Sequence, residues 1–306
     1  MNVTSYPKVY QLGHRAIKDL FLDEISVEEK IDGSQFSFGV KHDNGFRVLV
    51  CRSHHQQINL EEIPKMFTKA VETAQDLTPI LRAGLTYRCE YLNKPKHNVL
   101  AYDRVPKGNL IIFDIERGIQ DFLTPEERDI EAKRIGLESV PIFYRGKLHK
   151  YEDVIELLDE VSVLGGQQME GLVFKNHKRF SDHDGKIMVG KFVRESFKEL
   201  HSKEYKTNAK HIAIQIGESL NTEARWLKAI QHMKEDGTLT DSPKDIGPLL
   251  HAINDDVLEE CVDSIKNTLL KYHWKIICRT MTRGFPAWYK DQLAKKQFED
   301  DKACPF

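Results

Sequence analysis

The sequence lacks the features that mark membrane-spanning, secreted and zinc-binding proteins. None of its apolar runs is long enough to cross a bilayer. The opening residues, Met1 to Lys8, do not contain the apolar core of a secretion signal. Its five cysteines are scattered, without a Cys-x-x-Cys pair or a Cys/His cluster at zinc-binding spacing. We therefore expect a cytoplasmic protein with reduced thiols and no membrane partner.

An excess of one charge is also missing. The 45 Lys and Arg residues are balanced by 47 Asp and Glu residues, which gives a formal net charge of −2. Such a chain has no global basic field, so a nucleic-acid partner requires a local basic patch. With 306 residues, of which 40% are hydrophobic, the chain can bury a sizeable core, and we expect two domains. Nothing in the sequence indicates an obligate protein partner.

What the sequence does contain is a lysine motif at the end of a predicted strand. Lys30 stands two positions before Asp32 and three before Gly33, and alternating apolar residues from Phe36 to Val40 predict that a half-buried strand follows. A lysine amine is nucleophilic only when neutral, whereas its ordinary pKa is about 10.4. Burial or neighbouring cations would lower that pKa. The alternative for this short motif is a surface turn.

Gly33 and the strands that follow extend this prediction. Without a side chain, Gly33 would let the backbone approach a phosphate. Asp43-Asn44-Gly45 predicts a hairpin turn, with Arg52 at the end of the return strand. Further strands are predicted at 85–91, 110–115, 169–175 and 186–199, and their candidate site residues are Glu90, Phe113, Glu170, Lys175 and Lys191. Alternation places Glu170 and Lys175 on opposite faces unless a bulge at Gly171 brings them together.

Helices are predicted between these strands and throughout the end of the chain. Apolar spacing predicts helices at 61–77 and 151–164, and Thr124-Pro125-Glu126-Glu127 predicts a capped helix that ends at Gly136. Beyond about residue 205 the pattern is helical only. We place the domain boundary between 200 and 207, which predicts domains at 1–203 and 204–306. In the second domain, basic residues alternate with Trp274, Trp288 and Tyr289, as on a duplex-binding surface or a solvated helix face with aromatic core residues.

The order of these motifs resembles the covalent nucleotidyltransferase superfamily, which includes ATP-dependent RNA ligases, DNA ligases and messenger-RNA capping enzymes. The motifs are Lys-x-Asp-Gly at Lys30, then Arg52, Tyr-x-x-Glu ending at Glu90, Phe-Asp-Ile at Phe113, Glu-Gly-Leu-Val-Phe-Lys from Glu170, and Lys-Phe-Val-Arg from Lys191. Residues 132–137, Val140-Pro141 and Gly146 are similar to the RNA ligase branch typified by nick-sealing RNA ligase 2. The resemblance covers residues 25–200. It implies an α+β fold, with a nucleotidyltransferase (ATP-grasp-like) core of antiparallel sheets flanked by helices and an all-helical C-terminal domain.

The resemblance also implies a role for each motif residue. Lys30 would be the nucleophile that becomes covalently linked to AMP, and Glu29 and Ile31 would belong to the nucleotide site, with Glu29 on the adenine. Arg52 would contact the ribose or the phosphate of the incoming strand, Glu90 a ribose hydroxyl, and Phe113 the face of the base. Glu170 would orient a Mg²⁺ ion, and Lys175 and Lys191 would face the α-phosphate. The last motif departs from the family pattern, because its second lysine position is Val193. Arg194 or Lys198 is the candidate substitute.

These implications predict an ATP-dependent ligase that joins RNA 3′-hydroxyl and 5′-phosphate ends, with nicked or duplex RNA as the expected partner. The alternatives within the superfamily are a DNA ligase and a capping-type enzyme. DNA ligases and capping enzymes resemble each other in having a small β-barrel after this core. The helical pattern after residue 205 therefore disfavours both alternatives. A non-catalytic protein that binds RNA ends is the alternative from another class. Retention of Lys30, Glu90 and Glu170 argues against it.

Overall fold

The structure is a computed structural model that describes residues 3–150, 152–193 and 212–302. The chain divides into two compact units. The first comprises residues 1–198 together with 223–252, and the second comprises 199–222 together with 253–306. The predicted domain boundary, between 200 and 207, lies outside the described residues and stays a prediction. Residues 223–252, which follow that boundary, lie in the first unit.

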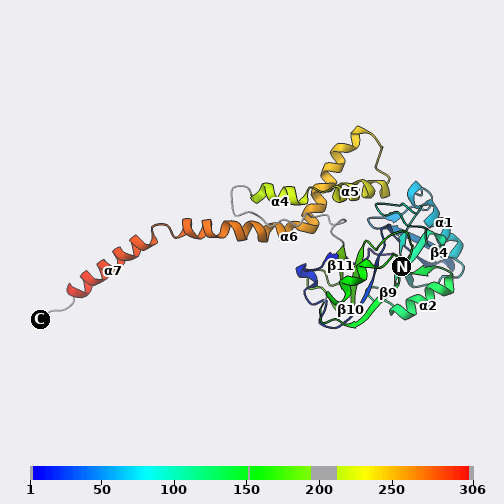
Figure 1. The fold of residues 1–306 in the computed structure, drawn as a ribbon, viewed down its shortest axis with the longest axis horizontal. Helices are drawn as coiled ribbons and strands as arrows, with labels where there is room; N and C mark the ends of the chain where they lie inside the picture. The colour runs from blue at the N-terminus through cyan, green and yellow to red at the C-terminus, as the bar shows by residue number, and fades with distance from the viewer. Residues whose placement is uncertain (1–2, 151, 194–211, 303–306) are drawn as a thin grey trace. The chain divides into compact units, whose positions relative to one another are not determined.

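Two sheets form the centre of the first unit (Figure 1). The five-stranded sheet has the order β1-β11-β10-β2-β9 and is antiparallel except for the β1–β11 pair. Its strands are β1 (Tyr10–Gln11), β2 (Glu24–Lys30), β9 (Ile142–Lys147), β10 (Gly171–Phe180) and β11 (Ile187–Val193).

The six-stranded sheet has the order β5-β4-β3-β6-β7-β8 and is antiparallel except for β7–β8. Its strands are β3 (Ser34–Asp43), β4 (Phe46–Ser53), β5 (Gln57–Ile58), β6 (Leu85–Tyr91), β7 (Leu110–Arg117) and β8 (Glu138–Ser139). The chain passes from one sheet to the other between β2 and β3, directly after Lys30. The predicted α+β fold with mostly antiparallel sheets is confirmed.

Local chemistry explains several of these boundaries. The β3–β4 hairpin turns at Asn44 and Gly45, whose φ angles of 49° and 84° suit a tight two-residue turn. Helix α2 (Pro125–Ile135) starts at Thr124 with the predicted capping box, and ends at Gly136 in the left-handed conformation. Both predictions are confirmed.

Two predicted helices are shorter than their apolar spacing indicated. Helix α1 runs over Thr68–Leu77 and follows a 3₁₀ turn, η2 (Lys65–Phe67), because Pro64 has extended backbone angles. The segment predicted at 151–164 contains only α3 (Glu152–Ile155) and η4 (Glu156–Asp159). Its later residues fold back as a β-bridge between Val161 and Gln168, which Gly165 and Gly166 allow with positive φ angles. Two further 3₁₀ turns are η1 (Arg15–Ile17) and η3 (Lys107–Asn109).

Each sheet has its own apolar core. Phe36 and Phe38 of β3 pack with Tyr87 of β6 and with buried residues of α1 and α2. Under the five-stranded sheet, Val27 and Phe174 form a second cluster with apolar residues that include Val154 of the short helix α3. Because one face of each sheet is used for this packing, polar residues at alternate positions are left for the opposite face.

The remaining described elements are helical, as predicted. They are α4 (Ile212–Leu220), α5 (Glu223–Glu235), η7 (Pro243–Asp245), α6 (Ile246–Met281) and α7 (Phe285–Lys302). Helix α5 lies in the first unit. Within the described part of the chain, no helix combines the length and apolar character needed to span a membrane.

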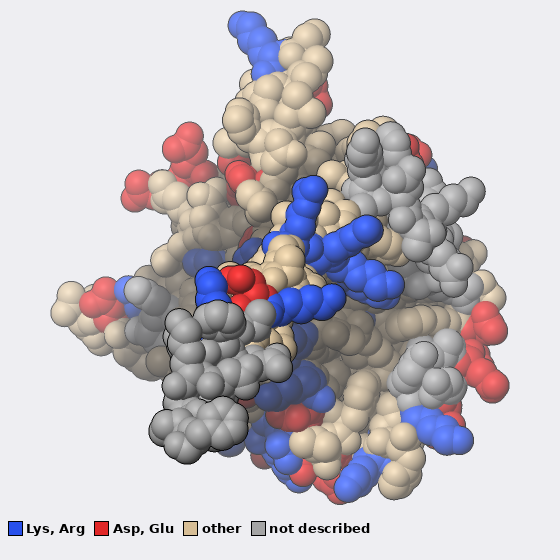
Figure 2. Space-filling model, turned by 90° about the vertical axis from the view of Figure 1, so that its left-hand side faces the viewer, with Lys and Arg blue, Asp and Glu red and all other residues tan. Residues whose placement is uncertain are grey.

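Three aromatic side chains of α6 and α7 are largely exposed. Trp274 and Trp288 are 53% and 56% exposed, and Tyr289 is 49% exposed. The alternative of aromatic core residues is therefore excluded for these three side chains. The face shown in Figure 2 carries Lys and Arg side chains interspersed with Asp and Glu side chains, in keeping with the balanced charge of the chain.

Candidate active site

Lys30 lies where the two sheets meet. It is the last residue of β2, and its Cα is opposite that of Gly171, the first residue of β10. Glu170 precedes Gly171, so its carboxylate reaches the lysine from the neighbouring strand end. The Lys30 Nζ donates to both carboxylate oxygens, at 2.9 Å to Oε1 and 2.7 Å to Oε2. The lysine side chain is 27% exposed and therefore remains accessible.

The charge environment of Lys30 differs from the prediction. Burial lowers the pKa of the Lys30 amine, but the Glu170 carboxylate, with help from Asp32 and Glu90, outweighs burial and raises the pKa above its ordinary value. Of the two predicted causes of a lowered pKa, burial acts as expected, whereas the charges that act most strongly on Lys30 are carboxylates and not cations. The nearest charges are carboxylates, which stabilise the ammonium form. The amine must therefore lose a proton before it can act as a nucleophile.

Glu90 and Glu170 are two of the acids whose charges act on Lys30. Burial raises the pKa of Glu90 to about 8, and Glu235 and Glu170 add to the effect while Lys30 opposes it. Burial also raises the pKa of Glu170, against the lowering effect of Lys30. At neutral pH Glu90 therefore holds a proton, which gives it a hydrogen-bond donor as well as an acceptor.

The turn after Lys30 is held by the loop at residues 93–102. The Asp32 carboxylate accepts the backbone N–H groups of Val99 and Leu100, at 2.9 and 2.7 Å, and the Asp32 N–H donates to the Tyr102 hydroxyl at 2.8 Å. The role of Asp32, which the motif alone did not indicate, is to position this turn. Loop residues distant in sequence thus determine where the lysine backbone lies.

Gly33 has a packing role in the structure. A Cβ at this position would lie 2.7 Å from both Glu90 Cγ and the Tyr91 carbonyl oxygen. The glycine therefore allows close approach of β6. The prediction that a phosphate approaches the Gly33 backbone stays a prediction.

Glu29 and Arg52 each carry a buried atom without a partner. Glu29 is 3% exposed, and its Oε2 accepts the Val163 N–H at 3.0 Å. Glu29 Oε1 and Arg52 Nε are buried without a hydrogen-bond partner among the described residues. Burial raises the pKa of Glu29 and lowers that of Arg52. A buried polar atom without a partner is costly, so these two atoms indicate positions where a ligand can complete the hydrogen bonding.

Strand register places Arg52 and Glu90 on one face of the six-stranded sheet. Ser37 of β3 is opposite both Arg52 and Arg88, and Gln35, two positions earlier, is opposite Glu90. Arg52 also donates to the His55 carbonyl at 2.9 Å. The polar face of this sheet thus brings together two of the predicted site residues.

Lys191 and Lys175 share a face of the five-stranded sheet with Lys30, but their surroundings differ. Lys191 is opposite Val173, and its charge lowers the pKa of Glu170. Lys175 is 2% exposed, and its Nζ contacts Glu28 Oε2 at 2.6 Å and Asp114 Oδ2 at 3.1 Å. The structure therefore associates Lys191 with the Lys30–Glu170 pair, whereas the charge of Lys175 is compensated elsewhere.

The partners of Lys175 form a buried charge network that the motif comparison did not single out. Arg128 of α2 donates to Glu28 Oε1 at 2.7 Å and to the Phe113 carbonyl at 3.0 Å. Glu28, Asp114 and Arg128 were absent from the predicted site. Only Arg128 offered a signal in the sequence. It stands on the same face of the predicted helix as Ala132 and Ile135, where a charged residue needs a buried partner.

The predicted residues Phe113 and Ile31 take part in packing. The Phe113 ring is partly exposed and lies 5.4 Å from the Lys175 Nζ, measured to the ring centroid. Ile31 is 4% exposed and packs in an apolar cluster with Leu92 and Ile111. Val193 ends β11, whereas Arg194 and Lys198, the proposed substitutes for the missing lysine, lie outside the described residues.

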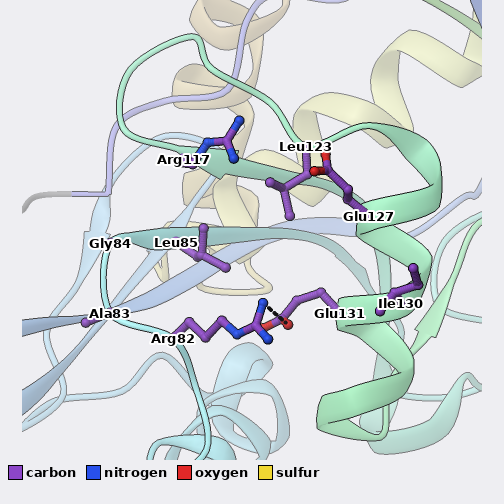
Figure 3. Close-up of a pocket in the computed structure, with 9 residues that line it drawn as sticks. All are labelled: Arg82, Ala83, Gly84, Leu85, Arg117, Leu123, Glu127, Ile130 and Glu131. Carbon is purple, nitrogen blue, oxygen red and sulfur yellow. Dashed lines mark ion pairs between the residues drawn. The ribbon is translucent and has the colours of Figure 1, made fainter.

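A cleft of about 400 Å³ is separate from these residues (Figure 3). It lies between β6, β7 and α2, and its lining includes the ion pair of Arg82 and Glu131, at 3.2 Å. None of the predicted site residues lines it. We therefore assign the candidate active site to the Lys30 region, where the strand ends converge.

Lys30 thus lies between two mostly antiparallel sheets, with polar residues facing it, as the resemblance drawn from the motifs implies. Residues 23–198, more than half of the chain, match the family model described as RNA ligase. The chain therefore belongs to the RNA ligase family. No curated protein sequence matches it.

Among solved structures, the chain is similar to variants of a Naegleria gruberi RNA ligase. An apo variant gives a TM-score of 0.44 at 20% identity, over 64% of this chain and 56% of that chain. A variant with ATP and Mn gives 0.44 at 20% identity, over 63% and 57%. A variant with AMP and Mn gives 0.43 at 20% identity, over 64% and 57%. The chain thus spans just over half of the length of these relatives.

Proposed function

We propose that this protein is an ATP-dependent RNA ligase in which Lys30 becomes covalently linked to AMP. The observation that carries the proposal is the contact of Lys30 Nζ with both oxygens of Glu170, at the end of β2 and within the residues matched to the RNA ligase family. The paired carboxylate lies within reach of the Lys30 ammonium and can accept its proton, as an adjacent base does for a nucleophile.

In the first step the deprotonated Lys30 amine attacks the α-phosphorus of ATP. An N–P bond forms, the P–O bond to pyrophosphate breaks, and pyrophosphate leaves. The ammonium loses one proton before the attack, and the nitrogen loses a second as the N–P bond forms. These protons pass to solvent, to a neighbouring carboxylate or to the departing pyrophosphate. Because Glu170 raises the pKa of Lys30, binding of a ligand that draws Glu170 away would favour the neutral amine.

The atoms that lack partners fit a nucleotide. Glu29 Oε1 can accept a hydrogen bond from the exocyclic amine of adenine, and Arg52 Nε can donate to a ribose or phosphate oxygen. The protonated Glu90 can both donate to and accept from a ribose hydroxyl. Phe113 offers an aromatic ring for the base. Each side chain would thereby gain a contact that the protein itself does not supply.

The carboxylates also fit a divalent metal ion. Mg²⁺ is commonly held by one or two carboxylates and by substrate phosphates, so Glu170 suffices as its main protein ligand. Among the described residues, no group of three or more His, Cys, Asp or Glu side chains is arranged to hold a metal ion. When bound, Mg²⁺ would stabilise negative charge on the phosphate oxygens. Lys191 would add positive charge on the same side of Glu170.

The later steps transfer AMP to RNA. A 5′-phosphate oxygen would attack the phosphorus of the lysyl-AMP and release the Lys30 amine, which gives an RNA-adenylate. An RNA 3′-hydroxyl would then attack the 5′-phosphate and release AMP. We propose nicked or duplex RNA as the substrate, held mainly through phosphates and sugars, with 2′-hydroxyls distinguishing RNA from DNA.

Labelling with ATP carrying radioactive α-phosphate, in the presence of Mg²⁺, tests the proposal. We expect wild-type protein to retain label on a denaturing gel and the Lys30→Ala variant to lose it completely. Lys178→Ala is the matched control, because Lys178 is on β10 with a side chain that is 70% exposed. A wild-type protein that takes no label would refute the covalent mechanism and leave a protein that only binds RNA ends.

Two comparisons separate the proposed ligase from its relatives. Stronger labelling by GTP than by ATP would favour a capping-type enzyme. Sealing of nicked DNA but not nicked RNA would favour a DNA ligase. We expect ATP to be the preferred donor and nicked RNA to be sealed faster than nicked DNA or single-stranded RNA.

A further inference from the structure

Helix α5 contacts the turn that follows Lys30. The helix lies beyond residue 198, where the match to the family model ends, but it belongs to the same compact unit as the two sheets. The side-chain amide of Gln231 donates to the Gly33 carbonyl at 3.1 Å and lies 3.3 Å from the Ser34 Oγ. The same Nε2 is 2.8 Å from Glu235 Oε1, one helical turn later.

The contacted residues link the lysine strand to the next sheet. Gly33 and Ser34 lie between Lys30, the end of β2, and the rest of β3. On the loop side, Asn98 Nδ2 donates to the same Gly33 carbonyl at 2.7 Å, and Ser34 Oγ is 2.9 Å from His97 Nε2. The turn is therefore held from two directions, by the loop at 93–102 and by helix α5.

Other residues of α5 besides Gln231 are also buried or in contact with the first unit. Ala229 and Met233, one turn apart on the helix, are 4% and 8% exposed. The ring of His232 lies 4.7 Å from that of His55, measured between centroids, in contact with the end of the β4–β5 hairpin. These contacts fix the position of the helix on either side of Gln231.

Glu235 is an unusual residue for such a contact. It is only 2% exposed, and a buried carboxyl group is costly unless it is hydrogen-bonded or protonated. Burial raises its pKa to about 7, while hydrogen bonds from Ser34 and Gln231 oppose the increase. A carboxyl group that is buried at this cost orients the Gln231 amide, because it receives one of the two N–H groups and directs the amide at Gly33 and Ser34.

We propose that Gln231, oriented by Glu235, is a positioning residue that keeps Lys30 in line with the α-phosphorus of ATP. The inference rests on the proposed function. Displacement of a reacting group by about 1 Å can cost about 100-fold in rate. Because the Asn98 contact remains when Gln231 is removed, we expect a smaller loss, of about 10-fold. The helix would thus couple the segment after the family-matched core to nucleotide transfer.

The test measures the initial rate of Lys30 labelling over a range of ATP concentrations, with the full-length chain. Gln231→Met keeps the length of the side chain but removes the amide. We expect its kcat for labelling to fall about 10-fold with an unchanged KM for ATP. The melting temperature should fall only slightly, because the Asn98 contact with the Gly33 carbonyl remains and Glu235 can take up a proton. Gln75→Met is the matched control, because Gln75 is an exposed glutamine on α1. We expect it to label at the wild-type rate.

A second pair of variants tests the partner residue independently. Glu235→Gln keeps an oxygen that can accept from Gln231, so it should retain most of the wild-type rate, whereas Glu235→Leu should lose activity as Gln231→Met does. A merely structural role would lower the rate only to the extent that it lowers the melting temperature.

The outcomes separate the inference from the proposed function. Wild-type kcat in Gln231→Met, or equal loss in Glu235→Gln and Glu235→Leu, would overturn the positioning role while leaving the ligase proposal intact. An unlabelled wild-type protein would overturn both. A lowered kcat at constant KM, together with rescue by Glu235→Gln, would support the positioning role.

Discussion

Two clusters of charged residues lie in the same core, and they differ in how fully their charges are compensated. In the buried cluster, Lys175 contacts both Glu28 and Asp114, and Arg128 contacts Glu28, with side chains that are at most 3% exposed. In the Lys30 cluster, one partly exposed lysine faces Glu170 directly and the charges of Asp32 and Glu90 at longer range. The first cluster pairs two cations with two carboxylates, whereas the second places the acids Glu170, Asp32 and Glu90 around one lysine.

The comparison shows how motif residues of the same type can serve different purposes. A fully paired buried cluster has no capacity left for a ligand, so its main contribution is to hold α2, β7 and β10 together. A cluster with raised carboxyl pKa values and unpartnered atoms nearby gains stability from cations such as a metal ion. Lys175 and Lys30 both belong to sequence motifs, but only Lys30 lies in the second kind of environment.

The largest expected effect comes from breaking the buried cluster. Arg128→Met removes a cation and leaves Glu28 with Lys175 alone, so we expect unfolding free energy to fall by about 3–5 kcal/mol. Urea unfolding would measure it. Arg117→Met is the control, because the Arg117–Asp121 pair is exposed and should contribute about 0–1 kcal/mol. If Arg128→Met and Arg117→Met lost equal unfolding free energy, the buried cluster would not contribute more to stability than an exposed ion pair.

The next effect should appear in catalysis rather than in stability. Glu170→Gln removes the carboxylate that pairs with Lys30 and is proposed to hold the metal ion. We expect the rate of labelling to fall by about 100-fold, or about 2.7 kcal/mol in barrier height, with little change in melting temperature. The substitution also removes the main cause of the raised Lys30 pKa. A faster rate at neutral pH would therefore show that Glu170 restrains the lysine instead of assisting it.

The smallest effect is a change in the pH dependence of stability. The pKa of Glu90 is about 8 in the folded protein, against an ordinary value of 4.5. Between these values the folded state keeps a proton that the unfolded chain has released, so stability falls as pH rises, by up to about 1.4 kcal/mol per pH unit. Glu90→Gln should flatten this slope. Urea unfolding at about pH 6 and about pH 7 would measure it, and parallel slopes in wild type and variant would contradict it.

Short-range patterns accounted for much of the fold. The Asn44-Gly45 turn, the capped helix at Pro125 and the strands that carry Glu90 and Phe113 follow from local backbone preferences and alternation, and the structure has them where they were predicted. The helix at 61–77 was predicted too long, because apolar spacing does not reveal that Pro64 is extended. Local signals therefore work best where a specific turn or cap residue marks the boundary.

The sequence alone determined the family, the order of the motifs and the position of Lys30 at a strand end, because these depend on residue type and spacing along the chain. Only the tertiary structure decided that Lys30 is surrounded by acids, that Lys175 is neutralised by Glu28 and Asp114, and that Gln231 contacts Gly33. These facts depend on distances between segments far apart in sequence. Electrostatic interactions act through space, so a residue's pKa and its partners are settled only when the strands and helices have packed.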